Sequence, residues 1–275
     1  RRVRLTLQFD GTDFFGWQSQ PKTGERTVQA AVEEAFSRLP GSHGPVIAAG
    51  RTDAGVHALA MTAHCDTDST IPDEKLRLAL NAHLPRDVVT LRVETAEADF
   101  HAQFDCRYRR YLYRLRVVRE HPRGMALDRY RVLSVYRNLD VAQMQAACAS
   151  LLGRHDFASF ATQETRATER TVYLCELREE AGELRLHIAA EGFLRNMIRT
   201  VVGTLLWVGK GKLSAADLPA IIAARDRTRA GHNVAAHGLY FVEAGYDEWD
   251  AQASELVAVE RGATPGVGRR GGTSV

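Results

Sequence analysis

The chain has 275 residues, of which 45% are hydrophobic and 25% are charged, and its formal net charge is +2. This composition is that of a globular protein long enough for one large domain or two fused halves. It excludes a strong overall basic field, and no apolar run approaches the roughly 18 residues of a membrane span. The first residues are charged and strand-like where a signal peptide needs an apolar core, so we expect a cytoplasmic protein without a membrane segment.

The cysteines and histidines show no metal-binding pattern. The four cysteines are scattered, without a CxxC pair or a zinc-like spacing (Cys65, Cys106, Cys148, Cys175). The histidines lack an HExxH motif or any other paired spacing. Since such spacings mark disulfide frameworks and zinc sites, the sequence predicts neither, and we assign no metal.

The first half of the chain shows the pattern β-α-β-β-α-β. Alternating apolar residues predict the first strand, and Thr27 is a plausible N-cap for the helix that follows. The expected elements are a strand over 3–9, a helix over 26–39, strands over 46–49 and 59–65, a helix over 73–83 and a strand over 87–95.

The second half repeats this order. A hairpin is expected to turn at Ala181-Gly182, and an apolar stripe runs along the long helix after it. The expected elements are a strand over 109–118, a helix over 140–152, the hairpin over 170–191, helices over 192–211 and 214–225, and a strand over 237–246.

This repeated order predicts an α+β fold of two ferredoxin-like βαββαβ halves, whose antiparallel sheets join around a central cleft. The halves share no sequence identity, so the repeat rests on pattern alone. We expect the N-terminal half at 1–105 and the C-terminal half at 106–250. The Gly-rich segment 251–275 loses apolar periodicity and is expected to be a flexible tail.

Asp53 is the first candidate for chemistry. It stands in "AAGRTDAGVHALA" (48–60), a polar interruption between two apolar strands, with Gly50 and Gly55 on either side. An aspartate that merely bonds its own turn is the common explanation. However, Arg51 is two residues away, and in extended chain the two side chains share one side. An arginine keeps a neighbouring carboxylate ionised, which suits a group that must attack something.

Tyr111 and Tyr113 lie on one face of the strand "RRYLYRLRVV", while Arg110, Arg114 and Arg116 lie on the other. Both tyrosines could be core residues, and for Tyr113 we favour that interpretation. Aromatic side chains beside arginines are also how proteins hold single-stranded nucleic acid. Tyr111, nearer the start of the strand, is the better candidate for such a contact.

Arginine dominates the basic residues, with 32 arginines against four lysines. A coding bias would explain this excess at least as well as selection for a chemical role. Nine of the arginines cluster between positions 107 and 131 (107, 109, 110, 114, 116, 119, 123, 129 and 131). The cluster predicts a surface that follows phosphates, with Arg109 and Arg110 as candidate RNA-backbone contacts. Arg195 and Arg199, with Gly203 further along the same predicted helix face, line either a groove for phosphate or a solvated surface.

Several motifs together resemble the TruA family of tRNA pseudouridine synthases. They are "FDGTDFFGWQSQ", "AAGRTDAGVHALA", "FHAQFDCRYRRYLYRL", "GRHDFASFA", "RTVYLCEL" and "GFLRNMIRTVVGTLLWVGKG", and they occur in the family's order up to about Tyr246. The closing segment "AGHNVAAHGLYFVEAGY" lacks the prolines usual just before the last strand.

The resemblance implies isomerisation of uridine to pseudouridine at positions 38, 39 and 40 of the tRNA anticodon stem-loop, by a homodimer without cofactor or metal. It implies that Asp53 is the essential aspartate, Arg51 its basic neighbour and Tyr111 the aromatic residue that contacts the target base. Two other classes stay open from the residues themselves. One is a non-catalytic RNA-binding protein. The other is a metal-dependent phosphate-ester hydrolase with Asp10, Asp13 and Asp53 as ligands.

Overall fold

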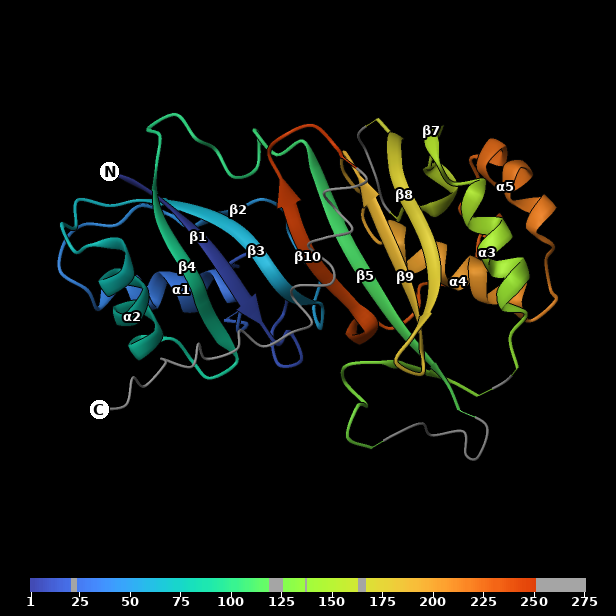
Figure 1. The fold of residues 1–275 in the computed structure, drawn as a ribbon, viewed down its shortest axis with the longest axis horizontal. Coiled ribbons are helices and arrows are strands. Elements are labelled where there is room, and N and C mark those ends of the chain that lie inside the picture. The colour runs from blue at the N-terminus through green and yellow to red at the C-terminus, as the bar shows by residue number, and fades with distance from the viewer. Residues whose placement is uncertain (21–23, 119–125, 137, 163–166, 251–275) are drawn as a thin grey trace, which may run out of the picture.

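The computed structural model describes residues 1–20, 24–118, 126–136, 138–162 and 167–250. Its centre is one ten-stranded, mostly antiparallel sheet with the path β4-β1-β3-β10-β5-β9-β8-β7; β2 pairs with β3 and β6 with β5. Figure 1 looks onto this sheet, with β10 and β5 near its centre and α1 and α4 behind it. The predicted mixed α+β architecture is therefore confirmed.

The first half contributes the strands β4, β1, β3 and β2. Its elements in chain order are β1 (Arg2–Phe9), α1 (Val28–Ser37), β2 (Ile47–Ala48), β3 (His57–Asp66), α2 (Asp73–His83) and β4 (Val88–Ala96). The Thr27 side chain accepts a hydrogen bond from the Ala30 amide at the start of α1, as the sequence predicts for an N-cap. The predicted bounds of α2 are also those observed.

The second half contributes β10, β5, β9, β8 and β7. Its strands and α-helices are β5 (Tyr108–Val117), β6 (Leu133–Val135), α3 (Val141–Ala149), β7 (Gly153–Asp156), β8 (Glu169–Glu180), β9 (Glu183–Ala190), α4 (Met197–Gly209), α5 (Leu218–Ala224) and β10 (Leu239–Gly245), with short 3₁₀ turns between them. Ala181 and Gly182 both have positive φ, so the hairpin turns where the sequence predicts. The short strands β6 and β7 were not predicted.

The two halves join through one short parallel pairing. Tyr240 and Phe241 of β10 pair with His57 and Ala58 at the start of β3, while the other edge of β10 pairs antiparallel with β5. Because the last strand of the chain is inserted between the two halves, the sheet is continuous. The loop that precedes β3 therefore lies at the centre of the molecule.

The two faces of the sheet differ in chemistry. On one face, Tyr111, Tyr113 and Leu115 of β5 belong to a single hydrophobic cluster that also includes the buried residues of all five α-helices. We call this the helical face. Successive side chains of a strand point to opposite faces, so Arg110, Arg114 and Arg116 lie on the other one, which we call the open face.

Two further expectations from the sequence concern the C-terminal segment and membrane-spanning helices. The predicted flexible tail, 251–275, lies outside the described residues. Within the described ranges, no helix is both long and apolar enough to cross a bilayer.

Candidate active site at the junction of the two halves

Asp53 lies in the loop between β2 and β3, where the two halves meet. The Val56 amide donates to the Asp53 carbonyl at 3.2 Å, and Gly55 has a φ of +78°. This left-handed value favours glycine, whereas Gly50 has no positive φ. The Asp53 side chain is 43% exposed, so a molecule arriving from solvent can reach its carboxylate.

The segment from Phe14 to Trp17 packs against this loop on one side. The Trp17 amide donates to the Thr52 carbonyl at 3.1 Å, and the Gly55 amide donates to the Phe14 carbonyl at 3.2 Å. Gly16, between them, has a φ of +90°, and a Cβ there would lie 2.4 Å from the Thr52 carbonyl oxygen. Only glycine allows this close approach, so the backbone on both sides of Asp53 is fixed from outside.

The Arg109 side chain holds the same loop by hydrogen bonds to backbone carbonyls. Its Nε and Nη2 donate to the Ala49 carbonyl at 2.9 and 2.7 Å. Nη2 also donates to the Gln103 carbonyl at 3.0 Å, and Nη1 to the Glu191 carbonyl at 2.8 Å. Arg109 thus holds three protein carbonyls together, and its predicted contact with an RNA backbone stays a prediction.

Arg199, near the start of α4, is the ion-pair partner of Asp53. Its Nη1 lies 3.4 Å from the Asp53 Oδ2, while its Nε donates to the Val234 carbonyl at 2.7 Å. The same Nη1 donates at 2.9 Å to the Oδ1 of Asn196, which has a left-handed backbone (φ 62°) immediately before the helix. Asn196 was not predicted as a site residue, although asparagine tolerates this conformation better than most residues.

Arg51 is exposed, and in the described part of the chain no carboxylate lies within ion-pair distance of it. The predicted pairing of Arg51 with Asp53 is therefore wrong. Its premise was an extended chain, but residues 51–53 belong to no strand and the turn follows at once. The guanidinium of Arg51 remains available at the entrance to the site, beside a carboxylate whose partner comes from the other half of the chain.

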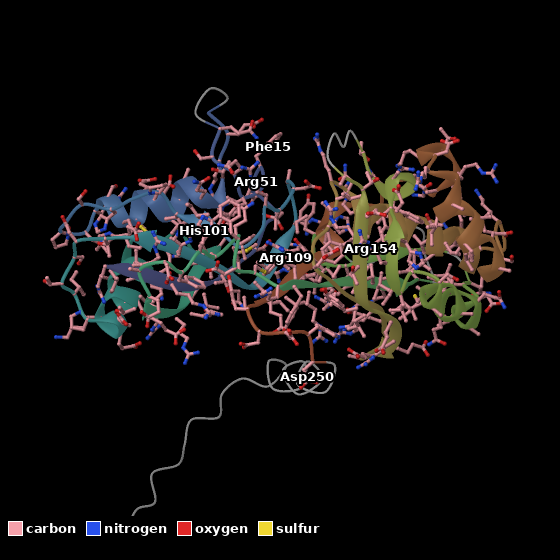
Figure 2. The ribbon with its side chains drawn as sticks, turned by 90° about the horizontal axis from the view of Figure 1, so that it is seen from above. Phe15, Arg51, His101, Arg109, Arg154 and Asp250 are labelled. Carbon is pink, nitrogen blue, oxygen red and sulfur yellow. The ribbon has the colours of Figure 1, made fainter. Side chains whose placement is uncertain are left out.

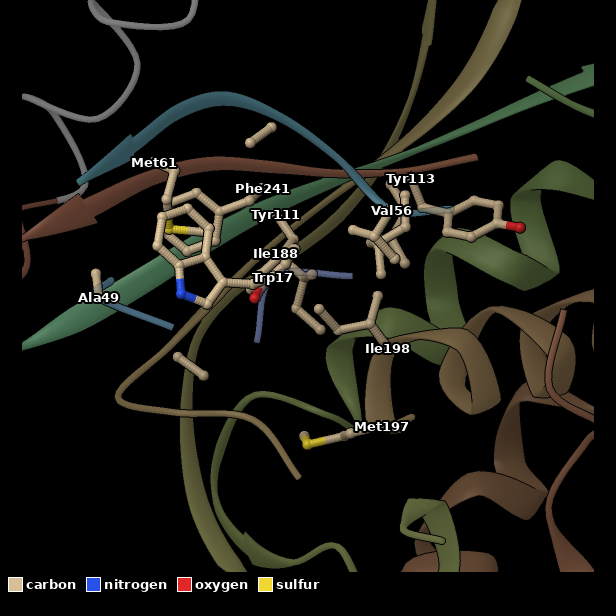
Figure 3. Close-up of a cluster of buried hydrophobic side chains, with 14 of the residues drawn as sticks. Trp17, Ala49, Val56, Met61, Tyr111, Tyr113, Ile188, Met197, Ile198 and Phe241 are labelled. Carbon is tan, nitrogen blue, oxygen red and sulfur yellow. The ribbon is translucent and has the colours of Figure 1, made fainter. Parts of the chain in front are cut away.

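Tyr111 belongs to the buried apolar cluster at the junction, and Figure 3 shows it beside Phe241. Its ring packs edge-to-face against Phe193 and Phe241, with centroids 5.1 Å apart in both pairs, and the residue is 7% exposed. Burial raises the pKa of its hydroxyl; the charge of Arg109 opposes that shift and that of Asp53 adds to it.

Tyr113, two residues further along β5, is fully buried. Its hydroxyl donates to the Ala235 carbonyl at 2.6 Å. Burial raises the pKa of this hydroxyl as well. The interpretation of Tyr113 as a core residue is confirmed, and its hydrogen bond ties β5 to the loop before β10.

The remaining candidate arginines do not form one surface. Arg110 is 3% exposed on the open face, opposite Tyr111, so the prediction that it contacts an RNA backbone is wrong for this structure. Arg195 is exposed but precedes α4, which begins at Met197, so it does not share a helical row with Arg199. Gly203 is buried against the His232 carbonyl, where a Cβ would lie 1.9 Å from the oxygen, so this glycine serves close packing and lines no groove.

The acidic residues proposed for a hydrolase do not gather. Asp10 accepts hydrogen bonds from Thr12 and Arg131, which together lower the pKa of its carboxyl to about 2 against the opposing effect of burial. Among the described residues there is no group of three or more His, Cys, Asp or Glu side chains placed to hold a metal ion. The ligand set of Asp10, Asp13 and Asp53 is therefore not assembled.

The site can perform carboxylate chemistry on an anionic molecule. The Asp53 carboxylate is 43% exposed on a turn held by hydrogen bonds, with Arg199 as its ion-pair partner and the exposed Arg51 two residues away to attract negative charge. Asp53 is thus placed to act as a nucleophile or a base.

Comparison with known proteins identifies the family of this chain. A family model described as tRNA pseudouridine synthase matches residues 6–109 and 147–247, the greater part of the chain. The chain belongs to this family. A protein of Thermus thermophilus named tRNA pseudouridine synthase A is 46% identical over 252 residues, covering 90% of this chain and 98% of that relative.

Two further relatives carry the same name. The protein of Caldicellulosiruptor bescii is 42% identical over 248 residues, and that of Ruminiclostridium cellulolyticum is 39% identical over 249 residues. In both cases the match covers 90% of this chain and 100% of the relative. The resemblance seen in the sequence motifs is confirmed, and with it an enzyme rather than a passive RNA-binding module.

Proposed function

We propose that the protein isomerises uridine to pseudouridine in tRNA, at positions 38, 39 and 40 of the anticodon stem-loop, with Asp53 as the catalytic carboxylate. The observation that carries the proposal is the setting of Asp53 in a chain of this family. Its carboxylate is 43% exposed and ion-paired with Arg199, and the loop that bears it is held by Arg109 and by the segment around Gly16.

The reaction suits a single carboxylate. The bond between N1 of uracil and C1′ of ribose breaks, a bond between C5 and C1′ forms, the proton on C5 leaves and N1 gains a proton. No electrons are exchanged with another molecule, and no second substrate is consumed. An ionised Asp53 can add to the nucleotide or abstract a ribose proton, and either role needs the fixed position that the loop provides.

The target uridine must leave its stack to reach Asp53, which costs a few kcal/mol. Tyr111 is the candidate to contact the extruded base. Because its ring packs against Phe193 and Phe241 and the residue is 7% exposed, the contact that fits is with the small part of Tyr111 that these neighbours leave open. Arg51 is the candidate for a flanking phosphate, since its guanidinium is exposed and planar.

Other features of the proposal concern assembly and location. The first half has the element order of a ferredoxin-like unit, and the second has it with β6, β7 and α5 added, so we assign 1–105 and 106–250 to two such units and propose that tRNA binds where they meet. We also propose a homodimer that works in the cytoplasm without a cofactor. The four cysteines are free, which suits a reducing compartment.

The test is direct. Unmodified tRNA is incubated with the protein, and pseudouridines are mapped by position; we expect them at 38, 39 and 40. Asp53→Asn should abolish product while tRNA binding is retained. Pseudouridine formation by Asp53→Asn at the wild-type rate would refute the role of Asp53, and product at other positions would refute the assigned specificity.

A further inference from the structure

Phe15 is an exposed aromatic residue on a rigid segment. Its side chain is 53% exposed, whereas its neighbour Phe14 is 3% exposed and packs under the guanidinium of Arg26 at 3.9 Å. The Phe15 amide donates to the Arg26 carbonyl at 2.8 Å, and the Gly16 carbonyl accepts from the Val28 amide at 3.2 Å. The backbone is therefore held on both sides of Phe15, which fixes the point from which its exposed ring projects.

This segment lies directly against the catalytic loop. The hydrogen bonds Trp17–Thr52 and Gly55–Phe14 bracket Phe15, and the missing Cβ of Gly16 would lie 3.1 Å from the Asp53 carbonyl carbon. Figure 2 shows Phe15 and Arg51 close together at the same edge of the molecule. An exposed aromatic ring and an exposed guanidinium without a carboxylate partner among the described residues thus flank one half-exposed aspartate.

We propose that Phe15 is a stacking platform for a base of the bound tRNA, at the entrance to the Asp53 site. The inference rests on the proposed function of that site. An extruded nucleotide leaves an unstacked base next to it, and an exposed phenyl ring on a fixed backbone offers that base a new stacking surface. Arg51 beside it can hold the adjacent phosphate, so that ring and guanidinium together match a base and its backbone.

The experiment measures the dissociation constant of unmodified tRNA in the Asp53→Asn background, where no turnover intervenes. Phe15→Ala should weaken binding by roughly 5- to 100-fold, the range expected from the loss of one base–aromatic stack. Phe15→Trp should bind at least as tightly as the parent. Phe15→Leu, which keeps apolar bulk but has no ring face, should bind nearly as weakly as Phe15→Ala.

The matched control is Leu78→Ala, because Leu78 is 55% exposed but lies on α2, away from the site. It should leave binding unchanged, and all variants should keep the parent's unfolding temperature. With Asp53 intact, most of the loss in kcat/KM of Phe15→Ala should appear as a higher KM. Unchanged binding by Phe15→Ala or by Phe15→Leu, or a loss in Phe15→Trp as large as in Phe15→Ala, would overturn the stacking role.

The two proposals can fail separately. If Asp53→Asn makes no product and Phe15→Ala binds tRNA like the parent, only the platform is wrong. If Asp53→Asn remains active, the proposed function of the site is wrong whatever Phe15 does.

Discussion

Two carboxylates in different parts of the molecule, Glu183 and Asp53, have different roles. Glu183 stabilises the fold, whereas Asp53 is placed to meet another molecule. Glu183, on the open face, has a side chain that is 2% exposed, and three arginines surround it: Arg114 at 2.7 Å, Arg116 at 2.7 Å and Arg185 at 3.3 Å. Asp53, at the junction, is 43% exposed and has one arginine at 3.4 Å. Glu183 has its charge fully used within the protein, whereas Asp53 keeps most of its hydrogen-bonding capacity for another molecule.

The arginines divide in the same way. Arg114 and Arg116 were predicted to follow phosphates, but both are held by acids, since Arg116 also pairs with Asp128. Arg51 is exposed and has no such partner in the described ranges. The number of arginines in a segment is thus a poor guide to nucleic-acid contact, because what matters is which of them retain an uncompensated charge.

The largest effect on stability should come from neutralising Glu183. We expect Glu183→Gln to lower the free energy of unfolding by about 3–5 kcal/mol, because three neighbouring arginines are left without their shared carboxylate. Chemical denaturation measures this loss. The kcat of the folded fraction should stay at the wild-type value, and a selective loss of kcat in a fully folded Glu183→Gln would break the contrast with Asp53.

Arg199 should matter for catalysis rather than for folding. Arg199→Gln removes the charge beside Asp53, and we expect kcat/KM to fall by about 10²–10³-fold, as for the loss of one preorganised charged donor. Arg225→Gln is the control, since Arg225 is 67% exposed and its ion pair with Asp156 lies on the surface. Equal activity in the two variants would show that the Asp53–Arg199 pair has no part in the reaction.

Arg109 extends the comparison, because it lies near the site but donates to backbone carbonyls of the protein. Lysine keeps the charge, but its single nitrogen cannot span the three carbonyls that the planar guanidinium reaches, so Arg109→Lys should lower kcat by about 10–100-fold, the cost of one or two charged hydrogen bonds. If Arg109 instead held a phosphate, lysine would largely replace it. The change would then appear in KM and its salt dependence, not in kcat.

A control for that substitution is available on the surface. Arg154 is 71% exposed, lies in β7 and pairs with Glu169 at 2.8 Å. Arg154→Lys should be close to neutral in both kcat and stability. Figure 2 shows that Arg154 lies apart from Arg51 and Arg109.

The sequence predicted local features well. The bounds of α2, the Thr27 cap and the turn at Ala181-Gly182 follow from signals a few residues long, and the structure has all three. Asp53 was found because its motif is polar within an apolar context. The alternation in β5 correctly put Tyr111 and Arg110 on opposite faces.

What the sequence could not show depends on contacts between distant segments. Arg199 meets Asp53 across 146 positions of the chain, and Arg114 meets Glu183 across 69. A local sequence pattern does not show which arginine pairs with which carboxylate. Arg51 was therefore predicted as the partner of Asp53, and Arg114 as a phosphate contact. The role of Arg109 was hidden for the same reason, since its acceptors are backbone carbonyls that belong to three other segments.

The smallest effect concerns acid sensitivity of the open face. Cross-strand pairing puts His64 opposite Arg4, and His187 opposite Leu112, on that face. Burial lowers the pKa of both imidazoles to about 4, and neighbouring positive charges add to the shift. Because the unfolded chain binds these protons near pH 6.5, it takes them up first as the pH falls. The stability from the neutral imidazoles is therefore complete above about pH 6.5 and is lost progressively between pH 6.5 and 4.

Thermal unfolding at pH 7.5 and pH 6 checks this sign. We expect Tm to fall by about 2–5 °C over that interval in the wild type. His64→Asn should reduce the fall, because the Asn oxygen can accept the hydrogen bond that the Ala102 amide now donates to Nδ1 at 3.1 Å, without taking up a proton. His83→Asn, at the exposed end of α2, should leave it unchanged. A Tm that rises on acidification, or the same fall in His64→Asn as in the wild type, would show that the buried histidines of the open face do not set its acid stability.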